Sequence, residues 1–91
     1  MLQRNKISEG DAYALLSNPR RRETVLTLLE AQDAELSLRE LSELVATRET
    51  GSAPAPRTHR ASVYNALHQT HLPKLHALDI VDYDPNRKLV R

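Results

Sequence analysis

The sequence predicts a mainly helical fold that ends in a small β-hairpin, and three observations support this. Apolar residues recur at helical spacing in four segments before residue 78. Helix-start signals precede several of these segments. Two β-compatible runs, 80–83 and 88–91, flank the turn-forming tetrapeptide Asp84-Pro85-Asn86-Arg87. This order predicts a mainly α fold with a small β wing, a winged helix-turn-helix, formed by one domain over residues 1–91.

The first two helices are predicted from their start signals. Ser8, with Asp11 three residues later, is typical of an N-cap, and a helix from about Glu9 to Ser17 follows. Asn18-Pro19 begins the second helix, because proline is tolerated at the first helical position, where its missing N–H costs nothing. The expected buried face is Val25, Leu26, Leu28 and Leu29, and the expected solvated face is Arg20, Arg21, Arg22, Glu23, Thr27 and Glu30.

A third helix begins at a capping box. Ser37-Leu38-Arg39-Glu40 has the S-x-x-E form, in which each side chain satisfies an unpaired backbone donor. Its apolar positions are Leu38, Leu41, Leu44 and Val45, and the helix is expected to end near Arg48. Residues 35–37 are expected to supply a third strand. The following segment, 51–56, contains two prolines and is expected to be a mobile loop without side chains that bury it.

The fourth and longest predicted helix covers residues 57–77. Pro73 lies within it and is expected to kink or restart the helix, because its ring clashes with the carbonyl four residues earlier. The two sides of this helix differ in polarity. Tyr64, Leu67, His71 and Leu75 lie on one side, with His68 and Leu72 at one edge and Val63 at the other; Thr58, Ser62, Asn65, Ala66 and Gln69 lie on the opposite side.

Composition excludes several classes of function. The 91 residues include no cysteine, which excludes disulfides and zinc knuckles. No apolar run approaches the roughly 18 residues of a membrane span, and residues 1–10 lack the apolar segment of a signal peptide. With two glycines there is no glycine-rich phosphate loop, and no nucleophile–base spacing is recognisable. We therefore expect a cytoplasmic protein that is not an enzyme and needs no cofactor.

The distribution of acidic residues indicates the partner. Asp and Glu make up 12 of the 91 residues, yet the 29 residues between Glu49 and Asp79 include neither. Random scatter would place about four acids in such a window. The window holds Arg57, Arg60, Lys74 and all four histidines. A surface kept free of negative charge favours an anionic partner, and nucleic acid is the first candidate.

The polar side of the fourth helix carries residue types that recognise DNA bases. Asn65 and Gln69 can each form bidentate hydrogen bonds with adenine, and Ser62 can pair with several base edges. Residues 57–60 at the helix start can hold phosphate through charge and free backbone donors. The predicted DNA-binding set is Arg39, Arg57, Thr58, His59, Arg60, Ser62, Asn65, Gln69, Arg87 and Lys88. The alternatives are an ordinary solvated helix face and, for Arg87 and Lys88, solubilising turn charges.

Two further groups of residues have competing interpretations. The Arg20–Arg22 run can form a second nucleic-acid patch, but pairing with Glu23 or with acids elsewhere is favoured. His68, His71 and His76 can be read as metal ligands, but three histidines without cysteine or a nearby acid make a poor set, so no metal is expected. His71 is instead expected to be a core histidine that donates to a backbone carbonyl, and His68 to lie at a helix–helix contact.

A family resemblance agrees with the predicted fold. His71-Leu72-Pro73-Lys74-Leu75, followed by Asp79-Ile80-Val81, resembles the end of the recognition helix in the arsenic-repressor-like winged-helix group. Residues 16–22, the third-helix motif and the segment Gln69-Thr70-His71-Leu72-Pro73-Lys74-Leu75 resemble an uncharacterised family of small haloarchaeal winged-helix proteins. The second resemblance covers about residues 11–91. It implies an archaeal DNA-binding regulator rather than an enzyme.

These observations predict a sequence-specific double-stranded DNA-binding transcriptional regulator. Helix 57–77 is the expected major-groove recognition helix, and hairpin 80–91 is the expected wing. A homodimer is expected because the core of so short a chain is small, with Tyr13 and Leu16 of the first helix as candidate contacts. The main alternative is a winged-helix protein–protein interaction module without DNA binding. A metal- or pH-sensing repressor is a third possibility.

Overall fold

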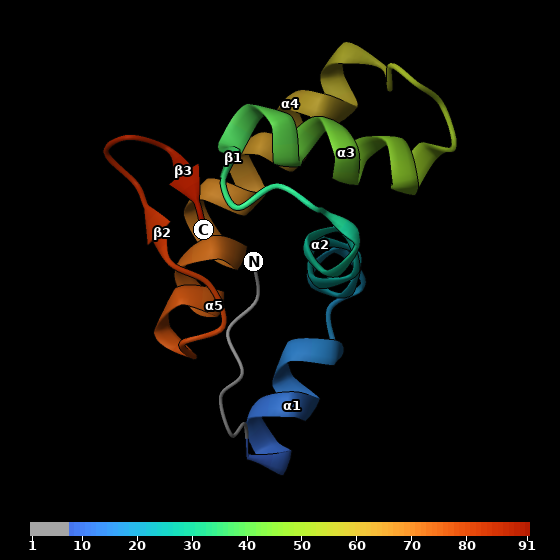
Figure 1. Cartoon of the computed structure of the whole chain (residues 1–91). Helices are drawn as coiled ribbons and strands as arrows, with labels where there is room; N and C mark the ends of the chain where they lie inside the picture. The colour runs from blue at the N-terminus through green and yellow to red at the C-terminus, as the bar shows by residue number, and fades with distance from the viewer. Residues whose placement is uncertain (1–7) are drawn as a thin grey trace.

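A computed structural model of the chain describes residues 8–91. The elements in chain order are α1 (Glu9–Leu16), α2 (Pro19–Glu30), β1 (Leu36–Ser37), α3 (Leu38–Thr50), α4 (Arg57–Ala66), the π-helical turn η1 (Leu67–His71), α5 (Leu72–Ala77), β2 (Tyr83–Asp84) and β3 (Leu89–Val90). Figure 1 shows α3 beside α4, α2 beneath α3, and the β2–β3 hairpin beside α5. The predicted fold class, mainly α with a small β wing, is confirmed.

The three short strands form one antiparallel sheet in the order β1-β3-β2. Val90 of β3 lies between Leu36 of β1 and Tyr83 of β2. Backbone hydrogen bonds of 3.0 and 2.9 Å between Asp82 and Arg91 extend the pairing beyond the strands. The predicted hairpin and the predicted third strand are therefore both present, although each strand is shorter than the apolar run that predicted it.

Side-chain capping fixes the start of two helices as predicted. The Ser8 hydroxyl accepts a 3.1 Å hydrogen bond from the backbone N–H of Asp11 at the start of α1. At the start of α3, the Ser37 hydroxyl accepts from the Glu40 N–H at 3.0 Å, and the Glu40 carboxylate accepts from the Ser37 N–H at 3.1 Å. This capping box joins α3 directly to β1, because Ser37 is both the last residue of the strand and the N-cap of the helix.

The end of α3 and the loop after it differ from the prediction. The helix continues to Thr50, two residues beyond the expected end, and stops at Gly51, which adopts the left-handed conformation with φ of 71°. The loop was expected to have no side chain that buries it, and this was wrong, because Ala55 is buried in the core. Its side chain is part of the hydrophobic core, so the loop is anchored just before α4 begins.

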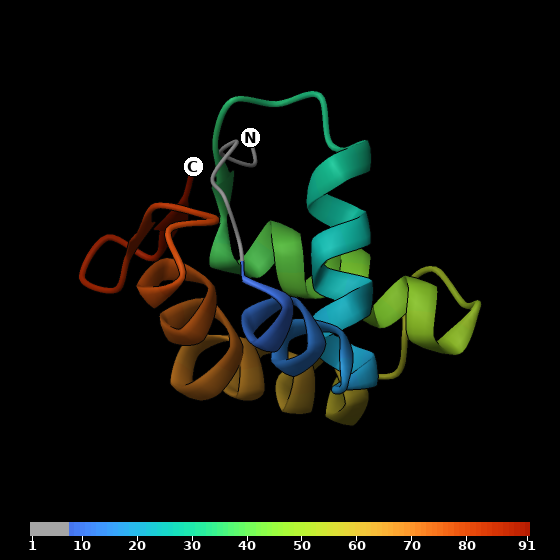
Figure 2. The ribbon, with the colours of Figure 1, turned by 90° about the horizontal axis from the view of Figure 1, so that it is seen from below.

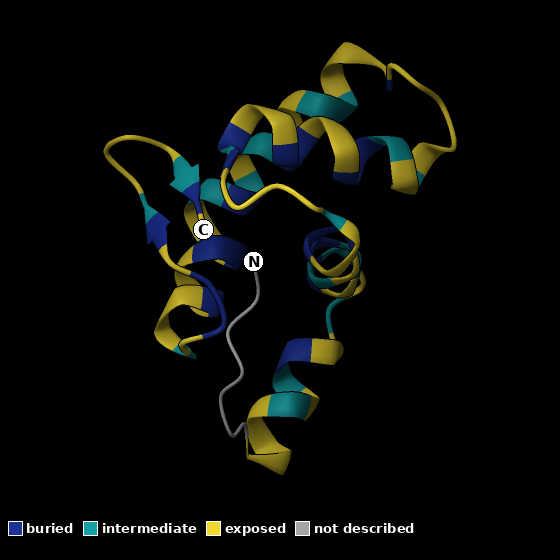
Figure 3. Cartoon of the chain, viewed as in Figure 1, coloured by how far each residue is buried: buried dark blue, intermediate teal, exposed yellow. Residues whose placement is uncertain are grey.

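Every helix and strand contributes at least one residue to the buried core (Figure 3). The fully buried large side chains come mainly from α3 and from the long helix formed by α4, η1 and α5. They include Leu38, Leu41, Val45, Val63, Leu67, Leu72 and Leu75. Apolar burial therefore fixes the orientation of the long helix and leaves its other side in solvent.

The predicted buried face of α2 was partly wrong. Leu28 is buried, but Leu26 and Leu29 are exposed, while Arg21 and Thr27, expected in solvent, are buried. The buried polar groups find partners locally: the Thr27 hydroxyl donates to Glu23 O at 2.7 Å, and Arg21 donates to carbonyls at the end of α1. A buried polar side chain is tolerated where hydrogen bonds are available, and here a neighbouring helix end supplies them.

The long helix is interrupted near Pro73, as predicted. Its first part is α-helical, residues 67–71 form a π-helical turn, and α5 begins at Leu72. Figure 2 shows the long helix from its olive start to its orange end along the lower side of the view. The backbone N–H of Leu72 bonds to the carbonyl of Leu67, five residues earlier. A wider turn accommodates the proline, which has no N–H to continue the α-helical pattern. The restart carries the chain into the hairpin without breaking the apolar side of the helix.

Candidate nucleic-acid interface

A groove of about 400 Å³ lies between the start of α3 and the first turns of α4. It is lined by Arg39, Ser42, Glu43, Arg57, Arg60, Ala61, Tyr64 and Asn65. Four of these belong to the set predicted to bind DNA: Arg39, Arg57, Arg60 and Asn65. The fold thus brings a residue of α3 together with three from α4, although 17 positions separate Arg39 from the nearest of them in sequence.

The remaining predicted residues of the long helix form a row on its solvent side. Thr58, Ser62, Asn65 and Gln69 are all exposed. Their spacing of four, three and four residues places them on one helical face. Gln69 lies within the π-helical turn, which shifts its position relative to that in a regular α-helix. Asn65 belongs both to this row and to the groove.

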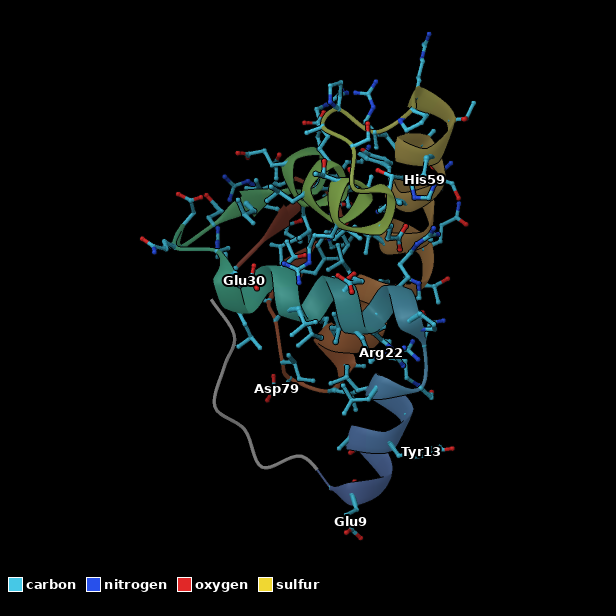
Figure 4. The ribbon with its side chains drawn as sticks, turned by 90° about the vertical axis from the view of Figure 1, so that its right-hand side faces the viewer. Glu9, Tyr13, Arg22, Glu30, His59 and Asp79 are labelled. Atoms are coloured by element: carbon cyan, nitrogen blue, oxygen red, sulfur yellow. The ribbon has the colours of Figure 1, made fainter. Side chains whose placement is uncertain are left out.

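Unlike the exposed residues of this row, His59 points toward α3 and contacts Glu49. Its Nε2 lies 2.8 Å from Oε1 of Glu49 on α3, and Arg20 of α2 donates to the two oxygens of the same carboxylate at 2.9 and 3.0 Å. Figure 4 shows where His59 lies on α4. We call Arg20, Glu49 and His59 the three-helix clasp. Its effect is to fix the start of α4 against α2 and α3.

The charge of Glu49 depends on competing effects. Partial burial raises the pKa of this carboxyl group, but hydrogen bonds and charge from Arg20 and His59 outweigh burial, so the net pKa lies below its ordinary value of 4.5. The ionised form is therefore the one that the folded protein favours. Sequence reasoning missed this role because Glu49 was noted only as the last acid before the acid-free window.

Arg60 lines two neighbouring grooves and is only weakly paired. Its Nη1 is 4.0 Å from Oε1 of Glu43, a long and weak ion pair, and its Nε is buried without a hydrogen-bond partner among the described residues. The side chain also lines a second groove, of about 490 Å³, between α3 and the loop before α4. Since Arg60 is only loosely paired, its guanidinium can bond to an anion entering the groove.

Arg87 and Lys88 are exposed in the turn of the hairpin. The Asp84 carboxylate shapes this turn by accepting hydrogen bonds from the N–H groups of Asn86 and Arg87 at 3.0 and 3.1 Å. Lys88 has a positive φ of 55°, and its carbonyl accepts from Leu38 N at 2.9 Å. The turn therefore presents two cations from a backbone that is tied to the start of α3.

Two histidines attach the hairpin to the long helix. The Nδ1 of His68 lies 2.7 Å from the hydroxyl of Tyr83, with the two rings edge to face, and the Nδ1 of His76 accepts the Tyr83 N–H at 3.1 Å. His68 was expected at a helix–helix contact, and the structure instead places it against β2. These contacts set the position of the wing relative to α5.

The structure also shows the contacts of the Arg20–Arg22 run and the surroundings of His71. Arg20 pairs with an acid elsewhere, as favoured, whereas Arg21 and Arg22 bond to backbone carbonyls at the end of α1. His71 is buried as expected, but its Nδ1 has no hydrogen-bond partner among residues 8–91. Burial, reinforced by the charges of Arg21 and Arg20, lowers the pKa of His71 below 6.5. No group of three or more potential metal ligands occurs within the described part of the chain.

Together, the architecture and the groove define a winged helix-turn-helix arrangement in which α3 and the long helix form the helix-turn-helix. Residues 13–91 match the family described as Domain of unknown function (DUF7344), and the chain belongs to that family. No curated protein and no solved structure matches the chain. Between residues 8 and 91 the structure contains no helix long and apolar enough to span a membrane.

Proposed function

We propose that this protein is a sequence-specific double-stranded DNA-binding transcriptional regulator that acts as a homodimer. The observation that carries the proposal is the groove between α3 and α4, where Arg39, Arg57 and Arg60 gather beside Asn65. Three guanidinium groups next to an exposed amide combine phosphate contact with a group that can pair with a base edge. No catalytic step and no cofactor belong to this proposal.

The long helix enters the major groove with its solvent row toward the bases. Asn65 and Gln69 are the proposed readers, because their amides can donate to and accept from adenine at the same time. Ser62 and Thr58 lie on the same row nearer the helix start. From Thr50 to Leu78 the chain has no acidic residue, so this surface approaches phosphate without repulsion from its own helix.

The cationic side chains at the edges of this surface hold the DNA backbone. Arg39 and Arg57 contact phosphate on one side of the recognition helix, with Arg60 exchanging its weak contact to Glu43 for a phosphate oxygen. On the other side, Arg87 and Lys88 of the wing contact backbone or minor groove. His59 takes part through the clasp, by holding the start of α4.

The resemblance to haloarchaeal winged-helix proteins, and more distantly to the arsenic-repressor-like group, supports the same proposal. The shared segment, Gln69 to Leu75, covers the end of the π-helical turn and the start of α5 at Leu72. These residues determine how the recognition helix leaves the DNA and enters the wing. The proposal accordingly places the protein among archaeal winged-helix regulators of the cytoplasm.

Selection from a random duplex library, followed by binding titrations on the selected site, tests the proposal. Asn65→Ala and Gln69→Ala are each expected to lose about 1–3 kcal/mol on the preferred site, with nonspecific affinity almost unchanged. Gln32→Ala is the matched control, because Gln32 is also an exposed amide side chain and lies outside the proposed interface. Equal losses on every sequence would exclude Asn65 and Gln69 as readers.

An absence of binding to every duplex would reject DNA recognition altogether. In that case the alternative, a winged-helix module that binds another protein, would account better for the exposed row. The salt dependence of binding separates the two, because counterion release makes DNA affinity fall steeply with salt.

A further inference from the structure

Four large apolar side chains of α1 and α2 are exposed to solvent. They are Tyr13 (78% exposed), Leu16 (49%), Leu26 (43%) and Leu29 (62%), and we call them the α1–α2 patch. Among the described residues, only Leu44 on α3 is a further large hydrophobic side chain that is exposed. Single exposed leucines are ordinary, but a group of this size on two neighbouring helices marks an interaction surface.

Polar contacts, together with the burial of Leu15, hold α1 in place. Arg21 donates to Leu15 O at 3.2 Å and to Ala14 O at 2.8 Å, and Arg22 donates to Leu16 O. Of α1, only Leu15 is buried. An eight-residue helix is marginal on its own, so these hydrogen bonds to its last carbonyls fix a helix whose apolar row has no partner within residues 8–91.

The exposed residues form two rows that meet at Arg22. The row on α1 is Glu9, Tyr13 and Leu16, and the row on α2 is Arg22, Leu26 and Leu29; both have the four-then-three spacing of one helical face. The hydrogen bond from Arg22 to Leu16 O joins the two rows. Figure 4 shows Glu9 at the free end of α1, Tyr13 pointing outward from its middle, and Arg22 near the start of α2.

We propose that the α1–α2 patch is the surface on which a second copy of this chain docks, with two-fold symmetry. A two-fold axis near Tyr13 pairs α1 with its copy in antiparallel fashion, so that Tyr13 faces Tyr13 of the partner subunit. Glu9, at the free end of the α1 row, then faces Arg22 of the partner subunit, which lies beside Leu16 at the other end of that row. The surface is therefore complementary to itself in charge, as a two-fold interface requires.

The patch can supply the apolar centre of such an interface, with the rest of the area coming from the residues around it. Its four side chains expose on the order of 400 Å² of mainly apolar surface, about half of the roughly 800 Å² that each partner contributes to a stable interface. Glu9, at the free end of the α1 row, places a charged group at the rim of the patch. The inference deepens the proposed function by giving its homodimer a surface, and it rests on that homodimer.

Sedimentation velocity on the full chain, without DNA, tests this inference. We expect the wild type to sediment at high micromolar concentration as a dimer of the 10.3 kDa chain. Tyr13→Ser and Leu29→Ser are each expected to raise the dimer Kd at least tenfold. Leu44→Ser is the matched control, because Leu44 is 46% exposed but lies outside the patch. Circular dichroism checks that each variant keeps its helices.

Charge exchange tests the two-fold arrangement independently. Glu9→Arg and Arg22→Glu are each expected to weaken self-association, whereas an equimolar mixture of the two variants is expected to form a mixed dimer in which both ion pairs are restored. A mixture that associates no better than either variant alone overturns the arrangement. The inference is also overturned by a wild type that stays monomeric, or by patch variants that behave like Leu44→Ser. Because no DNA is present, these failures are distinct from a failure of DNA recognition.

Discussion

Replacing Glu49 by glutamine is expected to destabilise the protein, because it removes the charge at the centre of the three-helix clasp. The carboxylate accepts two hydrogen bonds from Arg20 and lies 2.8 Å from the His59 ring nitrogen. Glutamine keeps one acceptor oxygen but presents an NH₂ group toward a donor. The substitution therefore leaves a guanidinium N–H without its partner and neutralises the only acid in the clasp.

The magnitude follows from the exposure of these groups. A hydrogen bond to a charged group contributes about 1.5–3 kcal/mol. The Glu49 side chain is 16% exposed and that of Arg20 is 26% exposed, so solvent screens part of this interaction. We expect a loss of about 1–2 kcal/mol in the free energy of unfolding. In a domain of this size, that corresponds to a fall in Tm of roughly 5–15 °C.

Thermal unfolding followed by circular dichroism measures this loss. Glu43→Gln is the control on the same helix, because Glu43 lies 4.0 Å from Arg60 and is half exposed, so its change should be below about 0.5 kcal/mol. The pKa of Glu49 is lowered by folding, so its contribution is present above pH 4.5 and is lost as pH falls through the lowered value. Equal melting of the two variants at neutral pH, or a difference that persists undiminished in acid, would refute the reasoning.

Three other substitutions test separate parts of the fold. His71→Leu is expected to reduce the loss of stability on acidification below pH 6.5, because burial lowers the pKa of His71 and the folded wild type resists its protonation; thermal melts between pH 7 and 5 measure this. Ser37→Ala is expected to lose about 1 kcal/mol in urea unfolding with the capping box, and no loss would exclude a role for the cap. Tyr83→Phe is expected to lose about 1 kcal/mol with its hydrogen bond to His68, and an unchanged denaturation midpoint would contradict this.

Local signals in the sequence predicted the frame of the fold well. The capping box at Ser37 and Glu40 depends on two residues three positions apart, so the sequence contains all of its information. Pro73 likewise predicted the interruption of the long helix, because a missing N–H acts on the residues next to it. The form of the interruption, a π-helical turn, was not predicted.

Burial on α2 was harder to predict, because it depends on groups far along or across the chain. Leu26 and Leu29 have the composition of a core face but remain in solvent, and Arg21 is buried because carbonyls at the end of α1 accept its hydrogen bonds. The spacing of apolar residues contains no information about hydrogen-bond acceptors on a neighbouring helix. The same exposed leucines that the periodicity misplaced became the basis of the proposed dimer surface.

In the candidate interface too, local features could be predicted from the sequence, whereas features that depend on packing between helices could not. Residue type and spacing identified Asn65 and Gln69 on the polar row, and both are exposed in the structure. Arg39, Arg57 and Arg60 line one groove because α3 packs against α4 across the loop. Sequence analysis predicted that each of them binds DNA but did not predict that they line the same groove. The part played by Glu49 in holding α4 required the same packing to be known.

The salt dependence of binding to duplex DNA tests the central claim most directly. Five cationic side chains, Arg39, Arg57, Arg60, Arg87 and Lys88, are proposed to contact phosphate. If each neutralises one phosphate, log affinity should fall linearly with log salt with a slope of about −4.5 per protomer, and Arg39→Ala should reduce its magnitude by about 1. A linear fall of this size is the predicted result. Affinity that is indifferent to salt, or absent for every duplex, would contradict the assignment of this surface to DNA.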